Sequence, residues 1–473
     1  MPSSYKGIVT GLRRSHDSKN NLYTILSSRA ISAKSKFVLE LGDVVTVKEI
    51  DEKEQTISSV EVNGRYERAD YERELSKKLE KLSIGRNAER IKKSYKREPY
   101  YETVERMSGA LQKAAASLFR SYISGAPILV RFHHDGDGSS GAVSLHRALS
   151  AIDKKFSMFG RSVSWIMNRG IDYNSTSIYS DLVELRNYES VELPVVLILD
   201  FGTAPGSAVP IAESRGKFKL IMLDHHPVYE GFPMEKVDHY INPWNYGSGT
   251  DFTAGLLTSV FAEMLCKVNT KDMRAASLIS DFSSFADRSS KPDQRTAVIL
   301  DYLTNVAGRY DSKIAKLTPS YIDNVLKDKG ESDSLFYEAS SSMNEMLDLG
   351  MRGVKPHRCR DGINAFVLDF DALPRSSSGY PLPGRFSSRL QEKLEEMNGS
   401  KTMTILYYGG YVTLRMSKKI SGTVKILDLI KRLEDTSDYV ESGGGHNEAA
   451  SIRVIDNHSK EIVDIILREL RPD

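Results

Sequence analysis

The sequence predicts an α/β protein with three parts: a domain built on a parallel sheet, a smaller α/β domain joined to it by a helix, and a small N-terminal β domain. Three observations lead to this prediction. In the middle of the chain, near-continuous apolar runs alternate with segments of helical periodicity, which is typical of a parallel sheet covered on both faces. A second alternation of strands and amphipathic helices fills residues 355–473. The first 65 residues hold short alternating runs between turn residues, which indicates β structure.

Length and composition fit a globular protein of several domains. The 473 residues exceed one ordinary core, and 40% hydrophobic and 27% charged residues are globular values. Because the formal net charge is only +2, attraction for an acidic partner must come from a local patch. Cys266 and Cys359 suit a reducing compartment and cannot form a zinc site alone. No signal peptide and no run of about 18 apolar residues is present, so we expect a cytoplasmic protein without a membrane partner.

Five segments are expected along the chain. They are a small β domain (1–70), a helical basic connector (71–124), the parallel-sheet domain (125–310), linker helices (311–354) and the second α/β domain (355–473). In the first segment, strands are predicted at 5–12, 22–28, 36–41, 43–50 and 56–62. Five short strands allow a small barrel of the OB type, although their number alone does not distinguish a barrel from a sandwich.

The connector combines a helix at 71–82 with a basic run at 86–97. Its six cations, against Glu89 alone, are Arg86, Arg90, Lys92, Lys93, Lys96 and Arg97. Tyr95, Tyr100 and Tyr101 are interleaved or adjacent. Such a run could hold phosphates and stack bases, whereas a solvated helix face or linker is the alternative.

The two α/β domains are predicted element by element. The apolar strands of the parallel-sheet domain are 127–132, 162–167, 194–201 and 218–224, with helices at 139–152 and 175–188. Residues 251–308 are expected to be helical, and the helix at 334–351 connects the domains. In the second domain, strands are predicted at 363–370, 402–408, 411–417 and 448–455, and helices at 387–397, 424–436 and 459–470.

Acidic and imidazole side chains follow three strands of the parallel-sheet domain directly. The first strand leads into "HHDGDG" (133–138), the third ends near Asp200, and the fourth leads into "DHH" (224–226). Because ligands of an open parallel sheet bind beyond the carboxyl ends of its strands, we expect these side chains to meet at one edge.

Repulsion among the acidic groups predicts a metal site at that edge. The carboxylates expected there are Asp135, Asp137, Asp200 and Asp287. They could not all stay ionised without a cation, and two divalent ions about 3.5–4 Å apart would use them all. Carboxylates mixed with imidazoles, without a thiolate, favour Mn²⁺, with Mg²⁺ as the alternative. Such a pair of ions would acidify a bridging water for attack on phosphorus.

Two glycine-rich segments suggest phosphate binding. The glycines of "DGDGSSG" permit a tight strand-to-helix turn that leaves the helix start at Ser139 and Ser140 open to a phosphate oxygen. Downstream, "ESGGGHNEAA" places three glycines before His446, and backbone N–H groups there, including those of Gly444 and Gly445, would suit an anion. A flexible turn between helix and strand is the alternative for this second segment.

These residues together resemble the DHH phosphoesterase superfamily, specifically its RecJ-like branch with a DHHA1 domain. The resemblance covers residues 125–456 and rests on four motifs in order: "HHDGDG", "LDFG", "DHHP" and "GGGH". It implies a parallel-sheet DHH catalytic domain joined by a helix to a substrate-binding DHHA1 domain, with the active site between them.

Carried over by position, the resemblance implies a set of metal ligands. They are His133, Asp135, Asp137, Asp200, His225 and Asp287, with Asp200 bridging two ions. Asp224 would orient the cluster, and His226 would lie against the scissile phosphate. Asp281 is the alternative last ligand, but "ADRS" is the closer match to the family and favours Asp287.

The resemblance also implies residues that bind the substrate. Arg389 of "GRFSSRL" corresponds to an arginine that clamps the substrate backbone, and His446 would bind a phosphate beside it. Arg385, and Arg169 of "IMNRG", are weaker candidates for the same work.

The implied activity is an exonuclease that hydrolyses single-stranded DNA or RNA to 5′-mononucleotides, in DNA replication or repair. One alternative is a phosphodiesterase or phosphatase on short oligonucleotides, cyclic dinucleotides or pAp; another is a replication scaffold without catalysis. The basic run at 86–97 favours a polymer, and the complete ligand set argues against the scaffold. The first 120 residues match nothing in the core family. A β module in front of the DHH domain resembles the arrangement in archaeal RecJ-like proteins. That resemblance implies an association with the replication complex through GINS.

Overall fold

The computed structural model describes residues 4–15, 21–27, 30–51, 53–156, 158, 163–229, 231–281, 283, 291–306, 317–374, 379–399, 401–446, 448–455 and 457–471, without the side chains of 291–293 and 446. The chain divides into two compact units, Met1–Thr304 with Asp311–Lys329 and Asn305–Tyr310 with Gly330–Asp473. Among the helices in the described ranges, none combines the length and the apolar character needed to cross a membrane.

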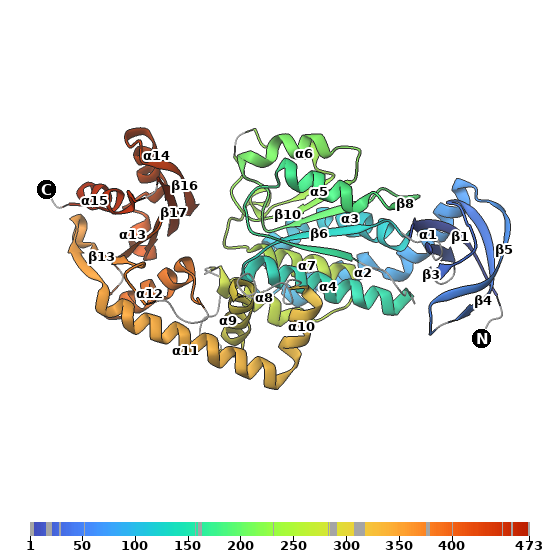
Figure 1. Cartoon of the computed structure of the whole chain (residues 1–473), viewed down its shortest axis with the longest axis horizontal. Coiled ribbons are helices and arrows are strands. Elements are labelled where there is room, and N and C mark those ends of the chain that lie inside the picture. Colours follow the sequence, from blue (N-terminus) through green and yellow to red (C-terminus); the bar gives the residue numbers. More distant parts are fainter. Residues whose placement is uncertain are drawn as a thin grey trace. The chain divides into compact units, whose positions relative to one another are not determined.

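The first unit begins with a small closed barrel (Figure 1). Its strands are β1 (Tyr5–Arg13), β2 (Asn21–Ser27), β3 (Ala30–Ser35), β4 (Asp43–Asp51) and β5 (Thr56–Arg65). They pair in the order β1-β2-β3-β5-β4, and β4 pairs back with β1, which closes the barrel. The predicted small β-barrel is therefore confirmed.

The third barrel strand lies earlier in the chain than predicted. The predicted strand 36–41 is an irregular bend and turn in which Phe37 and Val38 are exposed. The strand is instead 30–35, where Ala30 and Ala33 are fully buried. Small residues have low β propensity, but in a strand what counts is how a side chain fits its neighbours, and a narrow barrel interior accepts small ones.

Three helices after the barrel belong to the main hydrophobic core. They are α1 (Arg68–Leu82), α2 (Ile84–Tyr95) and α3 (Tyr101–Ile123). Their apolar residues pack in one cluster with those of the parallel sheet, so this segment is more than a solvated connector. Tyr95 and Tyr100 are only 1% and 5% exposed, so the interpretation that these rings stack on bases is wrong.

The central sheet of the first unit is entirely parallel, as predicted. Its strands are β6 (Ile128–His133), β7 (Val163–Asn168), β9 (Val195–Leu199), β10 (Lys219–Leu223) and β11 (His239–Ile241). They lie in the order β11-β10-β9-β6-β7. The strands that carry the predicted site, β6, β9 and β10, are therefore direct neighbours.

Helices cover both faces of this sheet (Figure 1). One face packs against α4 (Gly136–Phe156) and α7 (Ala254–Leu265), and the other against α5 (Ser175–Leu185) and α6 (Ala208–Ser214). Within β9, Val195, Leu197 and Leu199 join the first core while Val196 and Ile198 join the second. Burial on both faces is why these strands read as continuous apolar runs.

The helix predicted at 175–188 ends at Leu185. Residues Tyr188–Ser190 form a short strand, β8, that pairs antiparallel with β1 of the barrel. The ion pair between Arg14 and Glu189, at 2.6 Å, supports this pairing. A three-residue strand has too few residues for a period-2 pattern, so only its partner reveals it.

The predicted helical stretch 251–308 is three helices among the described residues, with breaks at 251–253 and 266–270. They are α7, α8 (Lys271–Ser280) and α9 (Lys291–Val306), and α10 (Pro319–Lys327) follows them in the first unit. The connecting helix of the sequence analysis is α11 (Lys329–Gly353), which begins the second unit.

The second unit is a mixed sheet with helices on both faces. Its strands are β12 (Lys355–Arg358), β13 (Asn364–Asp369), β14 (Thr402–Tyr408), β15 (Tyr411–Met416), β16 (Val440–His446) and β17 (Ala449–Val454). They pair in the order β12-β13-β14-β15-β17-β16, and only β13 and β14 are parallel. The helices are α12 (Pro383–Asn398), α13 (Lys418–Ser421), α14 (Ile426–Thr436) and α15 (Ser459–Glu469).

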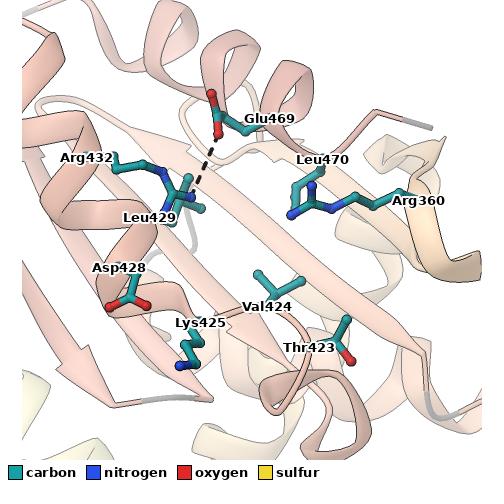
Figure 2. Close-up of a pocket in the computed structure, with 9 residues that line it drawn as sticks. All are labelled: Arg360, Thr423, Val424, Lys425, Asp428, Leu429, Arg432, Glu469 and Leu470. Carbon is teal, nitrogen blue, oxygen red and sulfur yellow. Dashed lines mark ion pairs between the residues drawn. The ribbon is translucent and has the colours of Figure 1, made fainter. Parts of the chain in front are cut away.

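A pocket of about 210 Å³ opens in the second unit (Figure 2). It lies beside the first turns of α14, and an ion pair of 3.7 Å joins Arg432 to Glu469 at its wall. Its lining is Arg360, Thr423, Val424, Lys425, Asp428, Leu429, Arg432, Glu469 and Leu470. None of the predicted site residues lines it.

Candidate metal centre

Asp200 lies directly after β9, at the centre of the predicted site. Its φ of 67° is uncommon for a residue other than glycine, and its backbone N–H donates to the Leu223 carbonyl at 3.0 Å. The side chain is 1% exposed. Within the described part of the chain, neither carboxylate oxygen has a hydrogen-bond donor. A buried carboxylate without donors is costly, so this position requires compensation by a cation or a proton.

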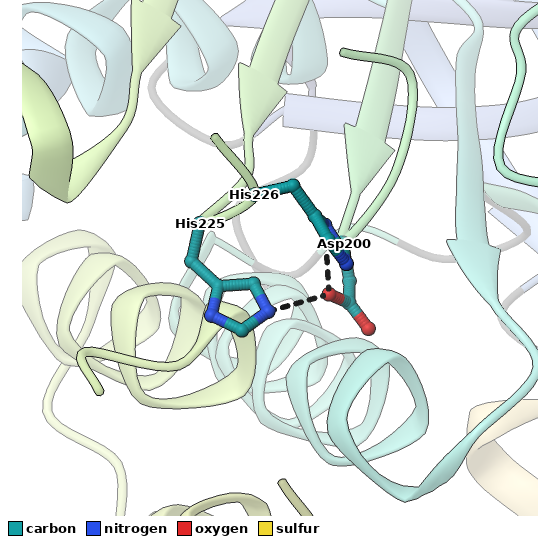
Figure 3. A group of neighbouring side chains, drawn as sticks. All are labelled: Asp200, His225 and His226. Atoms are coloured by element: carbon teal, nitrogen blue, oxygen red, sulfur yellow. Dashed lines mark ion pairs between the residues drawn. The ribbon is translucent and has the colours of Figure 1, made fainter. Parts of the chain in front are cut away.

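The two oxygens of Asp200 face different groups of ligand atoms. Oδ2 lies 3.7 Å from Nδ1 of His133, and Oδ1 lies 3.4 Å from Nε2 of His225. Figure 3 shows the rings of His225 and His226 both directed at Oδ1, with His226 Nδ1 at 3.9 Å. This is the arrangement of a carboxylate that can bridge two cations.

Among the residues that the structure describes, three overlapping groups of side chains could hold a metal ion, each with ligand atoms within 4.8 Å of one another. They are His133 with Asp135 and Asp200, Asp137 with His225 and Asp281, and Asp200 with His225 and His226. Asp200 and His225 each belong to two groups, so the structure brings together the residues that follow β6, β9 and β10. Carboxylates and imidazoles are suitable donors for divalent ions such as Mn²⁺ and Mg²⁺, so the donor set fits the implied metals.

Asp137 is fixed by the first turn of α7. Its Oδ2 accepts from the backbone N–H of Ala254 at 2.9 Å, and its Oδ1 accepts from that of Gly255 at 2.8 Å. Ser277 in α8 donates a further hydrogen bond to Oδ1. A Cβ atom on Gly255 would lie 2.8 Å from Oδ1 and 2.2 Å from the Ser140 hydroxyl, so only glycine permits this approach. A helix N-terminus stabilises a carboxylate, which orients Asp137 towards His225.

The turn after β6 is closed by a second carboxylate. Oδ1 of Asp135 accepts from the backbone N–H of Gly138 at 2.9 Å, while its Oδ2 lies 2.8 Å from Nδ1 of His133. A Cβ atom on Gly138 would lie 2.4 Å from the His133 carbonyl oxygen. The glycine therefore lets α4 start close against the end of β6, as the "DGDG" motif suggested.

The two histidines of "DHH" have separate orienting partners. Nδ1 of His225 lies 2.9 Å from the Thr250 carbonyl oxygen, so it donates there and leaves Nε2 as a ligand atom. Nδ1 of His226 lies 2.8 Å from Oδ1 of Asp224. The other oxygen of Asp224 accepts from the Thr203 hydroxyl at 2.9 Å. Asp224 thus holds the ring of His226, and its role in orienting a metal cluster stays a prediction.

The charges of the cluster change its proton affinities. Burial raises the pKa of Asp200 well above its ordinary value, and the neighbouring carboxylates of Asp135 and Asp137 raise it further. Burial also raises the pKa of Asp281, to about 7. Burial acts to lower the pKa of His226, but the Asp224 carboxylate raises it to about 9. The carboxylates therefore resist ionisation together unless additional positive charge is present.

The last ligand remains a choice between two aspartates. Asp281 lies at the end of α8, with Oδ2 3.8 Å from Nδ1 of His225. Asp287, which the sequence analysis preferred, lies outside the described residues.

The other predicted phosphate contacts of the first unit differ in accessibility. Ser139 and Ser140 are fully buried, so the expectation that their helix start is open to a phosphate is wrong. Gly138, in the first turn of α4, packs too tightly against the His133 backbone to leave that space. Arg169 is exposed and follows Asn168, the residue opposite His133 in the β6–β7 register, so it lies at the edge of the metal cluster.

In the second unit, the glycine motif is a strand rather than a turn or nest. Gly444 and Gly445 belong to β16 and pair with Ser451 and Ala450. A Cβ atom on Gly445 would lie 2.3 Å from the Ala449 carbonyl oxygen, and the residue has a φ of 141°. These glycines therefore form neither the predicted nest nor the flexible turn given as its alternative, because the close strand pairing that requires glycine is invisible in the local pattern.

The basic residues predicted to bind substrate also lie in the second unit. Arg389 on α12 is exposed and forms an ion pair of 2.6 Å with Glu392. Arg385 lies near the start of the same helix and is half-buried. The side chain of His446 lies outside the described residues.

Several orienting groups were missed by the sequence analysis. Thr203, Thr250 and the start of α7 at Ala254 and Gly255 hold the ligands without being ligands themselves. The only local signal was "TAG", a helix N-cap followed by two small residues.

Comparison with known proteins supports the same fold. No family model matches the chain. A protein of Methanocaldococcus jannaschii, MJ1198, described as uncharacterized, is 22% identical over 468 residues, which cover 84% of this chain. The chain spans 60% of the length of that relative.

Solved structures resemble this chain over most of its length. A structure described as the DHH domain of a member of a family of ribosomal proteins covers 85% of this chain and 100% of its own, with a TM-score of 0.67 and 20% identity. A structure of exonuclease RecJ bound to manganese covers 76% of this chain and 94% of its own, with a TM-score of 0.47 and 19% identity. The chain therefore has the fold of a DHH-domain protein and carries a DHH-like cluster of candidate metal ligands.

Proposed function

We propose that this protein is a divalent-metal-dependent phosphoesterase that hydrolyses single-stranded nucleic acid, DNA or RNA, to 5′-mononucleotides. The observation that carries the proposal is the burial of the Asp200 carboxylate between two imidazole rings. Its buried carboxylate has no donor among the described residues, and its two oxygens face His133 and His225 separately. Ordinary packing gives no reason to retain such a group, whereas two cations would satisfy it.

Two metal ions would be held by residues of the first unit. The proposed ligands are His133, Asp135, Asp137, Asp200 and His225, with Asp281 or Asp287 as the last. Neither cysteine of the chain belongs to these groups of candidate ligands, which favours Mn²⁺, with Mg²⁺ as the alternative. When bound, divalent ions at such a site polarise a phosphoryl oxygen and make a water molecule a better nucleophile.

His226 is proposed to contact the phosphate. Burial acts to lower the pKa of His226, but the Asp224 carboxylate at 2.8 Å raises it to about 9 in the metal-free protein, which favours the protonated ring. The side chain is 37% exposed, so its Nε2–H can donate to an incoming phosphate oxygen. Arg169, exposed after β7, is proposed to hold a neighbouring phosphate at the same edge.

A polymeric substrate is proposed in preference to a short one because of the N-terminal barrel. Five-stranded barrels of the OB type bind oligonucleotides or oligosaccharides on one face, which favours a polymer as the substrate. Arg389 and His446 of the second unit are proposed to hold the backbone beyond the scissile bond. An involvement in DNA replication or repair, with GINS as partner, stays a proposal from the resemblance alone.

The proposal is tested with end-labelled oligonucleotides in the presence of Mn²⁺. We expect release of 5′-mononucleotides by the wild type, faster from a 20-mer than from a 2-mer, and none by Asp200→Ala. The matched control is Asp238→Asn, because Asp238 accepts from the backbone N–H of Leu220 at the opposite end of β10. Retained activity in Asp200→Ala would refute the mechanism. Faster hydrolysis of the 2-mer would favour a phosphodiesterase or phosphatase of small substrates. Binding of Mn²⁺ without hydrolysis would favour a scaffold without catalysis.

A further inference from the structure

We infer that the exposed side of α2 is a second contact surface for nucleic acid, which binds the phosphate backbone without reading bases. This surface, the basic face, consists of Arg86 and Lys93 on α2 and of Lys96 and Arg97 in the turn that follows it. The choice of a single-stranded nucleic acid as its partner rests on the proposed function, whereas the surface itself is a separate feature of the first unit.

The basic face is the solvent side of an amphipathic helix. The buried side of α2 is formed by Ile84, Asn87, Ala88, Ile91 and Tyr95. Arg86 and Lys93 are separated by seven residues, so they align along the opposite side of α2. At a rise of about 1.5 Å per residue they lie about 10 Å apart along the helix, and Lys96 and Arg97 continue the row of cations into the turn that follows.

The cations of the basic face have no internal partners. In the described part of the chain, none of the four forms an ion pair or a side-chain hydrogen bond. The nearby acids do not neutralise it: Glu89 lies 3.9 Å from Lys92, and Glu98 interacts with the Tyr100 hydroxyl. A solvated helix face usually alternates both signs of charge, whereas this one leaves four cations uncompensated.

The helix that bears the basic face is rigidly held. The Asn87 side chain donates to the Met264 carbonyl at 2.9 Å, and Arg90 donates to the Glu263 carbonyl at 3.1 Å. The Tyr95 hydroxyl lies 3.2 Å from a carboxylate oxygen of Glu263. A fixed array of cations loses less entropy on binding than a mobile one.

The segment after the basic face packs against Phe252, close in sequence to the residue that orients His225. The Tyr100 ring lies 5.8 Å from that of Phe252, in an edge-on contact. Phe252 is two residues after Thr250, whose carbonyl orients His225. A single-stranded nucleic acid that contacts the basic face would therefore contact the same unit that holds the candidate metal centre. Since Tyr95 and Tyr100 are buried, the contact is electrostatic rather than a stacking interaction.

The inference is tested by fluorescence anisotropy with a labelled 20-mer in EDTA, over a range of salt concentrations. Each phosphate contact to a single strand contributes about 0.7 to the slope of log K against log salt. Lys93→Gln with Lys96→Gln is therefore expected to reduce the slope by about 1.4 and the affinity at 0.1 M salt by roughly 25-fold. The control Lys154→Gln with Lys217→Gln removes the same charge from exposed positions outside the face and should change neither quantity by more than a small fraction.

Three results would overturn the inference. The first is an equal loss in the test and control variants, which would mean that net charge alone is responsible. The second is wild-type protein that binds polyglutamate with the same affinity and salt slope, which would make the face a site for acidic proteins. The third is no binding of the 20-mer at low salt. Mn²⁺-dependent hydrolysis of a 2-mer by the wild type is measured in parallel, so that failure of the basic face and failure of the proposed chemistry are distinguished.

Discussion

Replacing Asp200 with asparagine is expected to change the stability of the protein in opposite directions with and without metal. In EDTA, the variant loses a buried carboxylate that has no donor among the described residues and that is repelled by Asp135 and Asp137. Asparagine keeps an oxygen without a donor but removes the negative charge, and its amide N–H groups can donate to the neighbouring carboxylates; the removal of an unpaired buried charge is worth about 1–3 kcal/mol. We therefore expect Asp200→Asn to raise the free energy of unfolding of the metal-free protein by about 1–3 kcal/mol.

In the presence of Mn²⁺, the wild type is expected to be more stable than Asp200→Asn. An ion at 100 times its Kd stabilises the folded state by about 2.7 kcal/mol, and an amide at position 200 removes the central ligand and most of that gain. Since 1 kcal/mol shifts the Tm of a domain of this size by roughly 2 °C, the wild type should gain about 5 °C on addition of Mn²⁺. The variant should gain little.

Scanning calorimetry in EDTA and in Mn²⁺ measures both effects, and Asp238→Asn serves as the control because it keeps its acceptor for the Leu220 N–H. The reasoning fails if Asp200→Asn is less stable than the wild type in EDTA and shows the same Mn²⁺ shift. That pair of results would make Asp200 a structural residue.

Three further predictions concern the groups around the cluster. In the metal-free protein, Asp224→Asn should move the NMR titration midpoint of His226 below its pKa of about 9, and an unchanged midpoint would contradict the pairing. In the wild type, the stabilisation from this pair is complete below the unfolded-state pKa of about 6.5 and is lost as pH rises through about 9. Gly255→Ala should cost about 1–3 kcal/mol in urea unfolding and weaken Mn²⁺ binding, because its Cβ would lie 2.2 Å from a serine hydroxyl of α4; unchanged stability would disprove the close approach. Calorimetric titration with Mn²⁺ should show a larger loss of affinity for Asp281→Asn than for Asp287→Asn, because Asp281 offers a ligand atom within 4.8 Å of those of Asp137 and His225. The reverse order would identify Asp287 as the last ligand.

The hydrophobic pattern of the sequence was sufficient to predict the strands that are buried on both faces of the sheet. β6, β9 and β10 are apolar on both faces, and such runs have few interpretations other than a parallel sheet. It was insufficient where a partner decides the structure. The short strand β8 and the glycine strand β16 form only because β1 and β17 lie beside them, and small residues in β3 are stabilised by the barrel interior.

For the candidate site, the sequence by itself determined which side chains meet. Position directly after a parallel strand places a residue at the carboxyl edge of the sheet, so His133, Asp200 and His225 had to converge once the strands were neighbours. Only the tertiary structure decided how they are held. The donors to Asp137 come from α7, more than 100 residues away, and the partner of His225 is the Thr250 carbonyl, because hydrogen bonds between backbone groups and distant side chains leave no periodic trace in the chain.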